Sequence, residues 1–245
     1  MLTSGQLVGI AVNSKTNLVY AGTDTAVAVI NGSTDQLAAT VELSQGPYAL
    51  ALNQITNRVY VTDPDAVTVI DASASQVVAR IPLGDRSYGI ALNPITDMIY
   101  VASYSKDNGT VYVIDGSTNS LLTKIHLCCE LWGVAVDSNR NMIYVSNDNR
   151  SSVSVINGST NRVVDQLGVG SLPAYISVDE KSGVVYVANW GGDTVSVIGS
   201  ETVSTTSSRT AGQTYSYWLI GGLVAATAIL VLLTNVRRGG RRKLH

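Results

Sequence analysis

The sequence predicts an all-β fold of five repeated four-stranded units, followed by one C-terminal transmembrane helix. The first observation behind this prediction is a short strand with a central tyrosine that recurs every 40 to 44 residues. The second is a run of 19 residues without a charge, residues 218–236. The third is a set of Asn-Gly and Asp-Gly turns at matching places in the repeats, which supply the positive φ angles of tight turns. The recurring tyrosines are Tyr20, Tyr60, Tyr100, Tyr144 and Tyr186.

Each unit contains four short segments with the composition of β-strands. The first reads GIAVN, ALALN, GIALN, GVAVD and YISVD along the chain. The second carries the tyrosine and reads LVYAG, RVYVT, MIYVA, MIYVS and VVYVA. The third reads AVAVI, AVTVI, TVYVI, SVSVI and TVSVI, and a turn such as NGST or DASA follows it. The fourth, LAATVEL, VVARIPL, LLTKIHL and RVVDQLGV, alternates imperfectly, which is typical of a more exposed strand.

A four-stranded meander that repeats about every 40 to 45 residues is typical of a β-propeller blade, which buries both sheet faces against its neighbours. A helical repeat is excluded because no window before residue 215 keeps apolar residues at spacings of three and four. β-branched residues, which favour strands, dominate the segments instead. We therefore expect a five-repeat β-propeller over residues 1–200.

The units resemble the YVTN repeat family of β-propellers, which is common in surface-layer and other envelope proteins. The name-giving motif is closest at residues 60–62 (YVT) and 186–189 (YVAN). The turn at residues 113–118 (VIDGST) and the hairpin at residues 93–96 (NPIT) recur in register. The resemblance extends from residue 5 to residue 200, and it implies a seven-bladed ring and an envelope location.

The sequence leaves the number of blades open, because the chain supplies five units. When Gly9 is aligned with Gly89, residues 1–3 fall opposite residues 81–83, the end of a fourth strand whose beginning is missing. Either the ring closes with five blades, with residues 201–206 completing the last sheet, or the chain is a fragment of a seven-bladed propeller. No N-terminal signal peptide is recognised, so either the N-terminus is incomplete or the C-terminal helix leads membrane insertion.

Charge is distributed unevenly along the chain. All 18 acidic residues lie within residues 1–201, whereas residues 209–245 contain six basic residues and no acidic one. An acidic domain without clustered Lys and Arg repels nucleic acid, whose binding depends on phosphate neutralisation. We therefore expect no nucleic-acid partner.

The uncharged segment is long enough to cross a hydrocarbon layer of about 30 Å as a helix. We assign residues 215–236 to a transmembrane helix that binds membrane lipid, with Tyr215, Tyr217 and Trp218 as interfacial aromatics. The alternative is a buried core helix. The basic tail, residues 237–245, favours the cytoplasm, so we expect a single-pass plasma-membrane protein with the propeller outside.

Residues 201–214 are rich in Ser and Thr and are predicted to form a stalk, either O-glycosylated or plain, whose start may complete the last blade. Four Asn-X-Ser/Thr sequons are present in the propeller segment. Those at Asn31 and Asn157 are explained by turn chemistry. Asn108 and Asn149 are therefore the predicted glycosylation sites.

Ligand binding is predicted at one mouth of the channel, formed by the loops from fourth to first strands and from second to third strands. Rings can cover apolar ligand faces there while short polar groups orient hydroxyls or amides, which suits glycan or peptide recognition. The alternative is that the rings only pack between blades. The predicted binding residues are Tyr48, Tyr88, Trp132, Tyr175, Asp63, Tyr104, Asp148, Asn189, Trp190 and Asp193.

The function predicted from these features is non-catalytic binding or scaffolding of envelope protein or glycan. No nucleophile elbow, phosphate loop or metal-binding histidine spacing is found, and no catalytic residue, metal or cofactor is predicted. Cys128 and Cys129 are adjacent and give no disulfide framework. One alternative is a lactonase-like hydrolase that holds a divalent cation through Asp63, Asp148 and Asp193. Another is support of a partner subunit with a redox centre.

Overall fold

The computed structural model describes residues 7–104, 108–127, 130–199, 206–209 and 213–218, which form antiparallel β-meanders. Blade 1 contains β1 (Gly9–Asn13), β2 (Leu18–Gly22), β3 (Ala26–Asn31) and β4 (Gln36–Glu42). Blade 2 contains β5 (Ala49–Asn53), β6 (Arg58–Thr62), β7 (Ala66–Asp71) and β8 (Gln76–Pro82). Blade 3 contains β9 (Ser87–Asn93), β10 (Met98–Ser103), β11 (Thr110–Asp115) and β12 (Ser120–His126). Each predicted strand of these blades is present, in the predicted order.

Blades 4 and 5 add a short 3-10 turn between their second and third strands. Blade 4 contains β13 (Leu131–Asp137), β14 (Met142–Asn147), η1 (Asp148–Arg150), β15 (Ser152–Asn157) and β16 (Arg162–Gly168). Blade 5 begins with β17 (Pro173–Asp179), β18 (Val184–Asn189), η2 (Trp190–Gly192) and β19 (Thr194–Ile198). These turns have no counterpart among the elements predicted from the sequence.

The last sheet departs from the predicted stalk. Its outer strands are β21 (Gln213–Trp218), which pairs with β19 in parallel, and β20 (Thr206–Arg209), which pairs with β21. Residues 206–209 and 213–218 of this region thus extend the last sheet, and residues 201–205 and 210–212 lie outside the described residues. The predicted transmembrane helix would begin only after Trp218. Residues 219–236 and the basic tail lie outside the described residues. Among the residues that are described, no helix is long and apolar enough to span a membrane.

The hydrophobic core lies between neighbouring blades. The tyrosine of each second strand is fully buried in the first three blades, where it packs against the next blade. Leu50 and Leu52 of β5, for example, pack with Tyr20, Val27 and Val29 of blade 1. Because both sheet faces are covered, the second and third strands are nearly continuous apolar runs. Burial of one such aliphatic side chain contributes about 1.5 to 3 kcal/mol.

A polar contact joins consecutive blades on the face opposite the predicted binding loops. The Asn that ends a first strand accepts hydrogen bonds from the backbone of its own hairpin and donates to a side chain of the next blade. We call this contact the inter-blade latch. The three latches are Asn13 Nδ2 to Asn57 Oδ1 (2.9 Å), Asn53 Nδ2 to Asp97 Oδ1 (2.6 Å) and Asn93 Nδ2 to Asn141 Oδ1 (2.8 Å).

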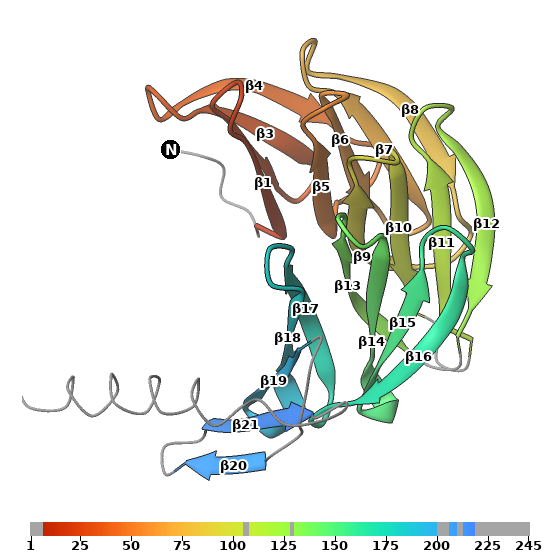
Figure 1. Ribbon diagram of the computed structural model, residues 1–245. Helices are drawn as coiled ribbons and strands as arrows, with labels where there is room; N and C mark the ends of the chain where they lie inside the picture. Colours follow the sequence, from red (N-terminus) through yellow and green to blue (C-terminus); the bar gives the residue numbers. More distant parts are fainter. Residues whose placement is uncertain (1–6, 105–107, 128–129, 200–205, 210–212, 219–245) are drawn as a thin grey trace, which may run out of the picture.

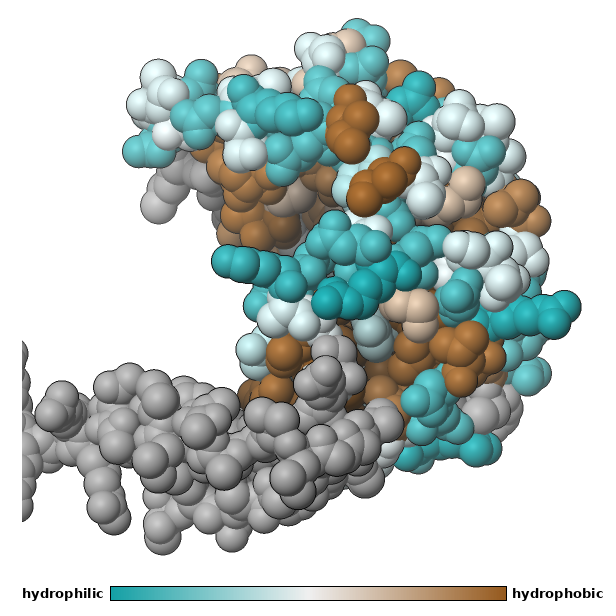
Figure 2. Space-filling view, in the orientation of Figure 1, coloured by the Kyte–Doolittle hydropathy of each residue, from teal (hydrophilic) through white to brown (hydrophobic). Residues whose placement is uncertain are grey.

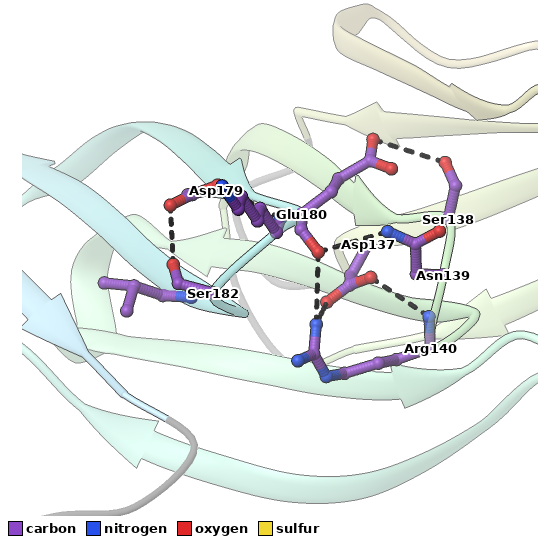
Figure 3. A network of polar contacts seen from close by, with 9 residues as sticks. Asp137, Ser138, Asn139, Arg140, Asp179, Glu180 and Ser182 are labelled. Atoms are coloured by element: carbon purple, nitrogen blue, oxygen red, sulfur yellow. Dashed lines mark hydrogen bonds and ion pairs between the residues drawn. The ribbon is translucent and has the colours of Figure 1, made fainter.

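The junction between blades 4 and 5 uses a different set of contacts (Figure 3). Asp137 stands where the earlier blades have Asn, and Gly183 occupies the acceptor position, so neither half of the latch remains. Instead, the Arg140 guanidinium pairs with buried Asp137 at 2.7 Å and donates to the backbone oxygen of Glu180 in blade 5. Asn139 Nδ2 donates to the same oxygen at 3.1 Å.

The outermost strands of blades 1 to 4 carry a bulge at one shared position. The pairing between the third and fourth strands shifts register after the last valine of the third strand, which leaves one fourth-strand residue unpaired. Bulges of this kind bend an edge strand and hinder its pairing with another chain. The unpaired residues are Ala38, Val78, Leu122 and Val164.

The five blades form an open arc and do not close a ring (Figure 1). The first strands line the inside of the arc and contact one another in the order β1, β5, β9, β13 and β17. Ile10 and Val12 of β1 are 68% and 52% exposed, although their counterparts Leu50 and Leu52 pack in the core. Apolar surface is accordingly visible inside the opening beside blade 1 (Figure 2). Of the two arrangements expected from the sequence, closure with five blades is not observed.

Candidate functional site: an aromatic cluster on three blades

Four of the predicted aromatic residues form one cluster on the predicted binding face. The ring of Tyr88 stacks between Tyr48 and Trp132, with both centroid distances at 5.0 Å. Tyr104 meets Tyr88 and Trp132 edge-on at 5.4 and 5.8 Å. All four side chains are partly exposed. We call Tyr48, Tyr88, Tyr104 and Trp132 the aromatic cluster. Each such ring pair contributes about 0.5 to 1.5 kcal/mol beyond its buried area.

Close approach of the first strands brings these rings into contact. Tyr88 and Trp132 occupy the same position in consecutive blades, and a glycine follows each of them. A Cβ on Gly89 would lie 2.2 Å from the Trp132 backbone oxygen, and one on Gly133 would lie 2.4 Å from the Ala174 oxygen. Neither distance is compatible with a side chain. The two glycines therefore allow the backbone spacing at which successive rings stack.

Hydroxyl groups at the ends of second strands tie the start of the next first strand in place. Thr62 Oγ1 donates to the Tyr88 oxygen at 3.3 Å. Ser146 Oγ donates to the Ala174 oxygen at 2.8 Å and accepts from the Gly133 N–H. The orientation of the aromatic cluster is thus set by backbone contacts between blades as well as by ring packing.

A matching pair of residues occupies the same two positions in blades 3, 4 and 5, before the first strand and after the second strand. In every pair, the residue after the second strand donates its N–H to the residue that precedes the first strand. The side chains differ completely: one pair is basic and aromatic, the next is doubly acidic, and the last is apolar. The pairs are Tyr104 with Arg86 (2.7 Å), Asp148 with Glu130 (2.9 Å) and Trp190 with Leu172 (2.9 Å).

The charged groups of blades 3 and 4 shape the electrostatics of the cluster. The hydroxyls of Tyr88, Tyr48 and Tyr104 raise the pKa of Arg86, which stays protonated. Burial, and then the neighbouring Glu130 carboxylate, raise the pKa of Asp148 above its ordinary value. Burial and Glu130 also raise the pKa of Tyr104. A cation at the blade 3 side and two close carboxylates at the blade 4 side therefore flank the stacked rings.

The indole of Trp132 offers an unused hydrogen-bond donor in this place. Its Nε1 is buried and has no hydrogen-bond partner of acceptable geometry. The Asp148 carboxylate lies close enough for the indole to oppose the rise in the pKa of Asp148.

Two of the predicted binding residues have a structural role instead. Asp63 is buried, pairs with Arg80 at 3.1 Å and accepts a hydrogen bond from Thr68. Asn189 is buried and donates to Thr194 and Ser196. Both residues stand at the end of a second strand, three positions after its tyrosine, where every blade has a buried polar side chain. The side chains of Asp63 and Asn189 thus make contacts within their own blades.

The remaining predicted residues, all on blade 5, stay outside the aromatic cluster. Tyr175 and Trp190 are 75% and 72% exposed, and Asp193 is exposed as well. Tyr175 stands at the position of Gly89 and Gly133, one place after the cluster position, so its side chain leaves the opposite side of the strand. Among the described residues, no ring contact joins either aromatic side chain to the cluster.

Three residues of the site were missed by the sequence analysis: Arg86, Glu130 and Leu172. Each lies just before a first strand, in a loop whose length varies between repeats, so its register was not evident. An alignment of the repeats could have identified these three residues, because each lies two residues before the position of the cluster aromatics. As predicted, Asn31 and Asn157 accept bonds from their own turns. Asn108 and Asn149, the predicted glycosylation sites, are exposed.

The chain is a β-propeller by its repeated four-stranded meanders, and the face predicted to bind ligand carries an aromatic cluster flanked by charged groups. Residues 99–216 match the family model described as Lactonase, 7-bladed beta-propeller. Hydrazine synthase of Kuenenia stuttgartiensis has a similar fold, with a TM-score of 0.55 and 12% sequence identity over 80% of this chain and 84% of that one. In all, 1338 chains of solved structures match, so the fold does not by itself define a function. The comparison with curated proteins found no match.

Proposed function

We propose that the protein is a membrane-anchored, outward-facing binding module, and that its aromatic cluster recognises an envelope protein or glycan without catalysis. The observation that carries this proposal is the combination of stacked, partly exposed rings with different polar pairs on successive blades. Repeats with one backbone geometry and different side chains on one face are typical of a recognition surface. The apolar segment and basic tail of the sequence support the anchor.

A lactonase-like hydrolase is the second candidate, and the family match favours it. In this hydrolase hypothesis, a divalent cation is held by the carboxylates of Asp63, Asp148 and Asp193. Asp63 is buried and already held by Arg80 and Thr68, which leaves it poorly placed to bind a cation at the channel mouth. A hydrolase would therefore depend on Asp148 and Glu130, which approach each other through their loops.

One set of measurements on the full chain in detergent distinguishes the binding module from the hydrolase. The binding module should retain defined glycans or peptides on an array, and Trp132→Ala should lower that signal at least tenfold. Leu122→Ala is the control, because this side chain is exposed on an outer strand of blade 3. Hydrolysis of lactones that is stimulated by Ca²⁺ and lost in Asp148→Asn would contradict the proposal and support the enzyme.

A further inference from the structure

The chemical character of the face predicted to bind ligand changes from blade to blade across blades 3, 4 and 5. The same backbone hydrogen bond joins the two members of each pair on this face, with N–O distances of 2.7, 2.9 and 2.9 Å. The first strands of these blades contact one another in the order β9, β13 and β17, so the pairs follow in the same order. We call the six residues the three-blade strip: Arg86 with Tyr104, Glu130 with Asp148, and Leu172 with Trp190.

The charged side chains of the three-blade strip are not paired with opposite charges in the described part of the chain. None of the ion pairs between described residues includes Arg86, Glu130 or Asp148. Arg86 is exposed, whereas the two carboxylates are half-buried beside each other. Like charges that are partly removed from water destabilise each other, so a cation beside them would be favourable. A ligand with an anionic group at blade 3 and a cationic group at blade 4 would therefore meet an opposite charge at both places.

The third pair adds an apolar contact at blade 5. Leu172 and Trp190 are 43% and 72% exposed. A Cβ on Gly191 would lie 2.7 Å from Leu172 Cγ, so the leucine side chain lies against the η2 turn that contains Trp190. Covering exposed apolar surface of this kind is favourable in water. The matching group on a ligand is thus an aliphatic side chain.

The spacing of the three pairs is compatible with an extended peptide. Sheets that pack face to face lie about 10 Å apart. The stacked rings of Tyr88 and Trp132, which occupy equivalent positions in blades 3 and 4, are 5.0 Å apart. An extended chain advances about 3.3 Å per residue, so side chains about two or three residues apart would reach consecutive pairs.

We propose that the three-blade strip binds an extended peptide segment of a partner protein, which places an acidic, a basic and an aliphatic side chain at blades 3, 4 and 5. The acidic group pairs with Arg86, and the basic group pairs with Glu130 and Asp148. The aliphatic group covers Leu172. The proposal rests on the binding function proposed above and adds the class of partner.

A peptide matches the three-blade strip better than a glycan does. One peptide chain carries both signs of charge together with aliphatic groups. A neutral glycan would leave the charges of blades 3 and 4 without counter-charges. An acidic glycan would pair with Arg86 but would be repelled by Glu130 and Asp148.

The test measures the binding of fluorescent peptides to the full chain in detergent by fluorescence anisotropy. The matching peptides carry Asp, Lys and Leu in this order, in either chain direction, with about two or three small residues between consecutive ones. In the exchanged peptides, Asp and Lys swap places, so composition and net charge are unchanged. We expect the best matching peptide to bind at least tenfold more tightly than its exchanged counterpart, and a high salt concentration should reduce this difference.

Exchanging the charges of the protein should reverse the preference. In a variant with Arg86→Glu, Glu130→Lys and Asp148→Asn, the exchanged peptide should become the tighter ligand. The backbone hydrogen bonds of both pairs do not require particular side chains, so they remain available. The control combines Arg162→Glu with Asp165→Lys, two exposed positions on β16, and should keep the wild-type preference.

Failure of the peptide proposal is distinguishable from failure of the proposed binding function. Equal affinity for matching and exchanged peptides, no binding of any peptide, or binding of neutral glycans alone would each overturn the peptide proposal. If Trp132→Ala still abolished the glycan signal, the binding function of the aromatic cluster would stand. If Trp132→Ala left all binding unchanged, the aromatic cluster would not be the binding site, and the function proposed for it would fall.

Discussion

Gly89 influences the positions of the rings in the aromatic cluster because it carries no side chain. Its position allows the backbone of β9 to approach that of β13, and this approach sets the distance between the rings of Tyr88 and Trp132. The same reasoning explains why the aromatic cluster ends at blade 4. At the matching places, blade 5 has Ala174 and then Tyr175, so the series of stacked rings is not continued.

We expect Gly89→Ala to lower the free energy of unfolding by about 2 to 3 kcal/mol, as overpacking of a tight junction does. The added methyl group would lie 2.2 Å from the Trp132 oxygen and would force β9 and β13 apart. Gly192→Ala is the matched control, since its nearest neighbour would be 3.4 Å away. Urea denaturation measures both variants. Equal stability of the two would show that the junction tolerates a wider spacing.

The raised pKa of Asp148 leads to a prediction about pH. Burial and Glu130 disfavour the ionised carboxylate in the folded protein, so the wild type loses stability as the pH rises from the ordinary pKa of Asp through the raised one. Asp148→Asn should therefore have the higher melting temperature at pH 7, and the advantage should disappear below the ordinary pKa. Thermal denaturation over a pH series checks this.

Asp115→Asn is the control for that series. Hydrogen bonds from Ser117 hold the pKa of Asp115 below its ordinary value, so the ionised form is favoured in the folded protein. The substitution should give no increase in melting temperature at pH 7. An increase of the same size in both variants would attribute the effect to net charge and not to the surroundings of Asp148.

At the scale of secondary-structure elements, the latch explains why an Asn ends the first strand of blades 1 to 3. The residue has two tasks in blades 1 to 3, because its oxygen closes the hairpin and its amide group holds the next blade. The sequence shows the recurrence but not the second task. The donor and its acceptor are more than 40 residues apart, and only the packing of sheets brings them together.

Asn93→Ala should cost about 2 to 3 kcal/mol of stability, because it removes both the turn contacts and the bond to Asn141, and leaves the oxygen of half-buried Asn141 without its donor. Asn31→Ala separates the two contributions. Asn31 accepts the same pair of turn hydrogen bonds but holds no neighbouring blade. Urea denaturation should show the smaller loss for Asn31→Ala, and the difference measures the latch. A latch without energetic value would make the two losses equal.

At the scale of the whole molecule, the fold could be predicted from the sequence wherever the repeats determine it. Hydrophobic alternation and turn residues predicted the strands of blades 1 to 4 and their order, because local propensity and packing agree there. The sequence could not decide whether the arc closes, since closure depends on the angle between sheets. It also missed the strands at residues 206–209 and 213–218, where Ser and Thr predominate and pairing with β19 is not a local property.

The candidate site was partly predictable for the same reason. Register placed Tyr48, Tyr88 and Trp132 on one face, and the structure joins them in a stack. Burial distinguishes the polar residues, since Asp63 and Asn189 have the same residue types as ligand-binding groups but hold loops. Periodicity alone does not separate these roles.

Membrane anchoring remains a prediction about the whole chain. The full-length protein should stay with the membrane pellet after extraction at alkaline pH, because the segment of residues 218–236 is apolar over the length of a bilayer. A variant that ends after Trp218 should appear in the supernatant. Release of the full-length chain without detergent would remove the anchor from the proposed function.

The junction between blades 4 and 5 has a consequence for how a chain of near-copies finds one arrangement. Blades 1 to 3 carry interchangeable contacts, so any of them is chemically able to receive another in a wrong order or from a neighbouring molecule. Arg140, Asp137 and Gly183 form a set of contacts that no other junction in the described part of the chain has, since a side chain at position 183 would collide with the Arg140 guanidinium. The contacts of this junction are specific to blades 4 and 5, so they favour the packing of these two blades against each other. They also disfavour the exchange of blades with another chain during folding.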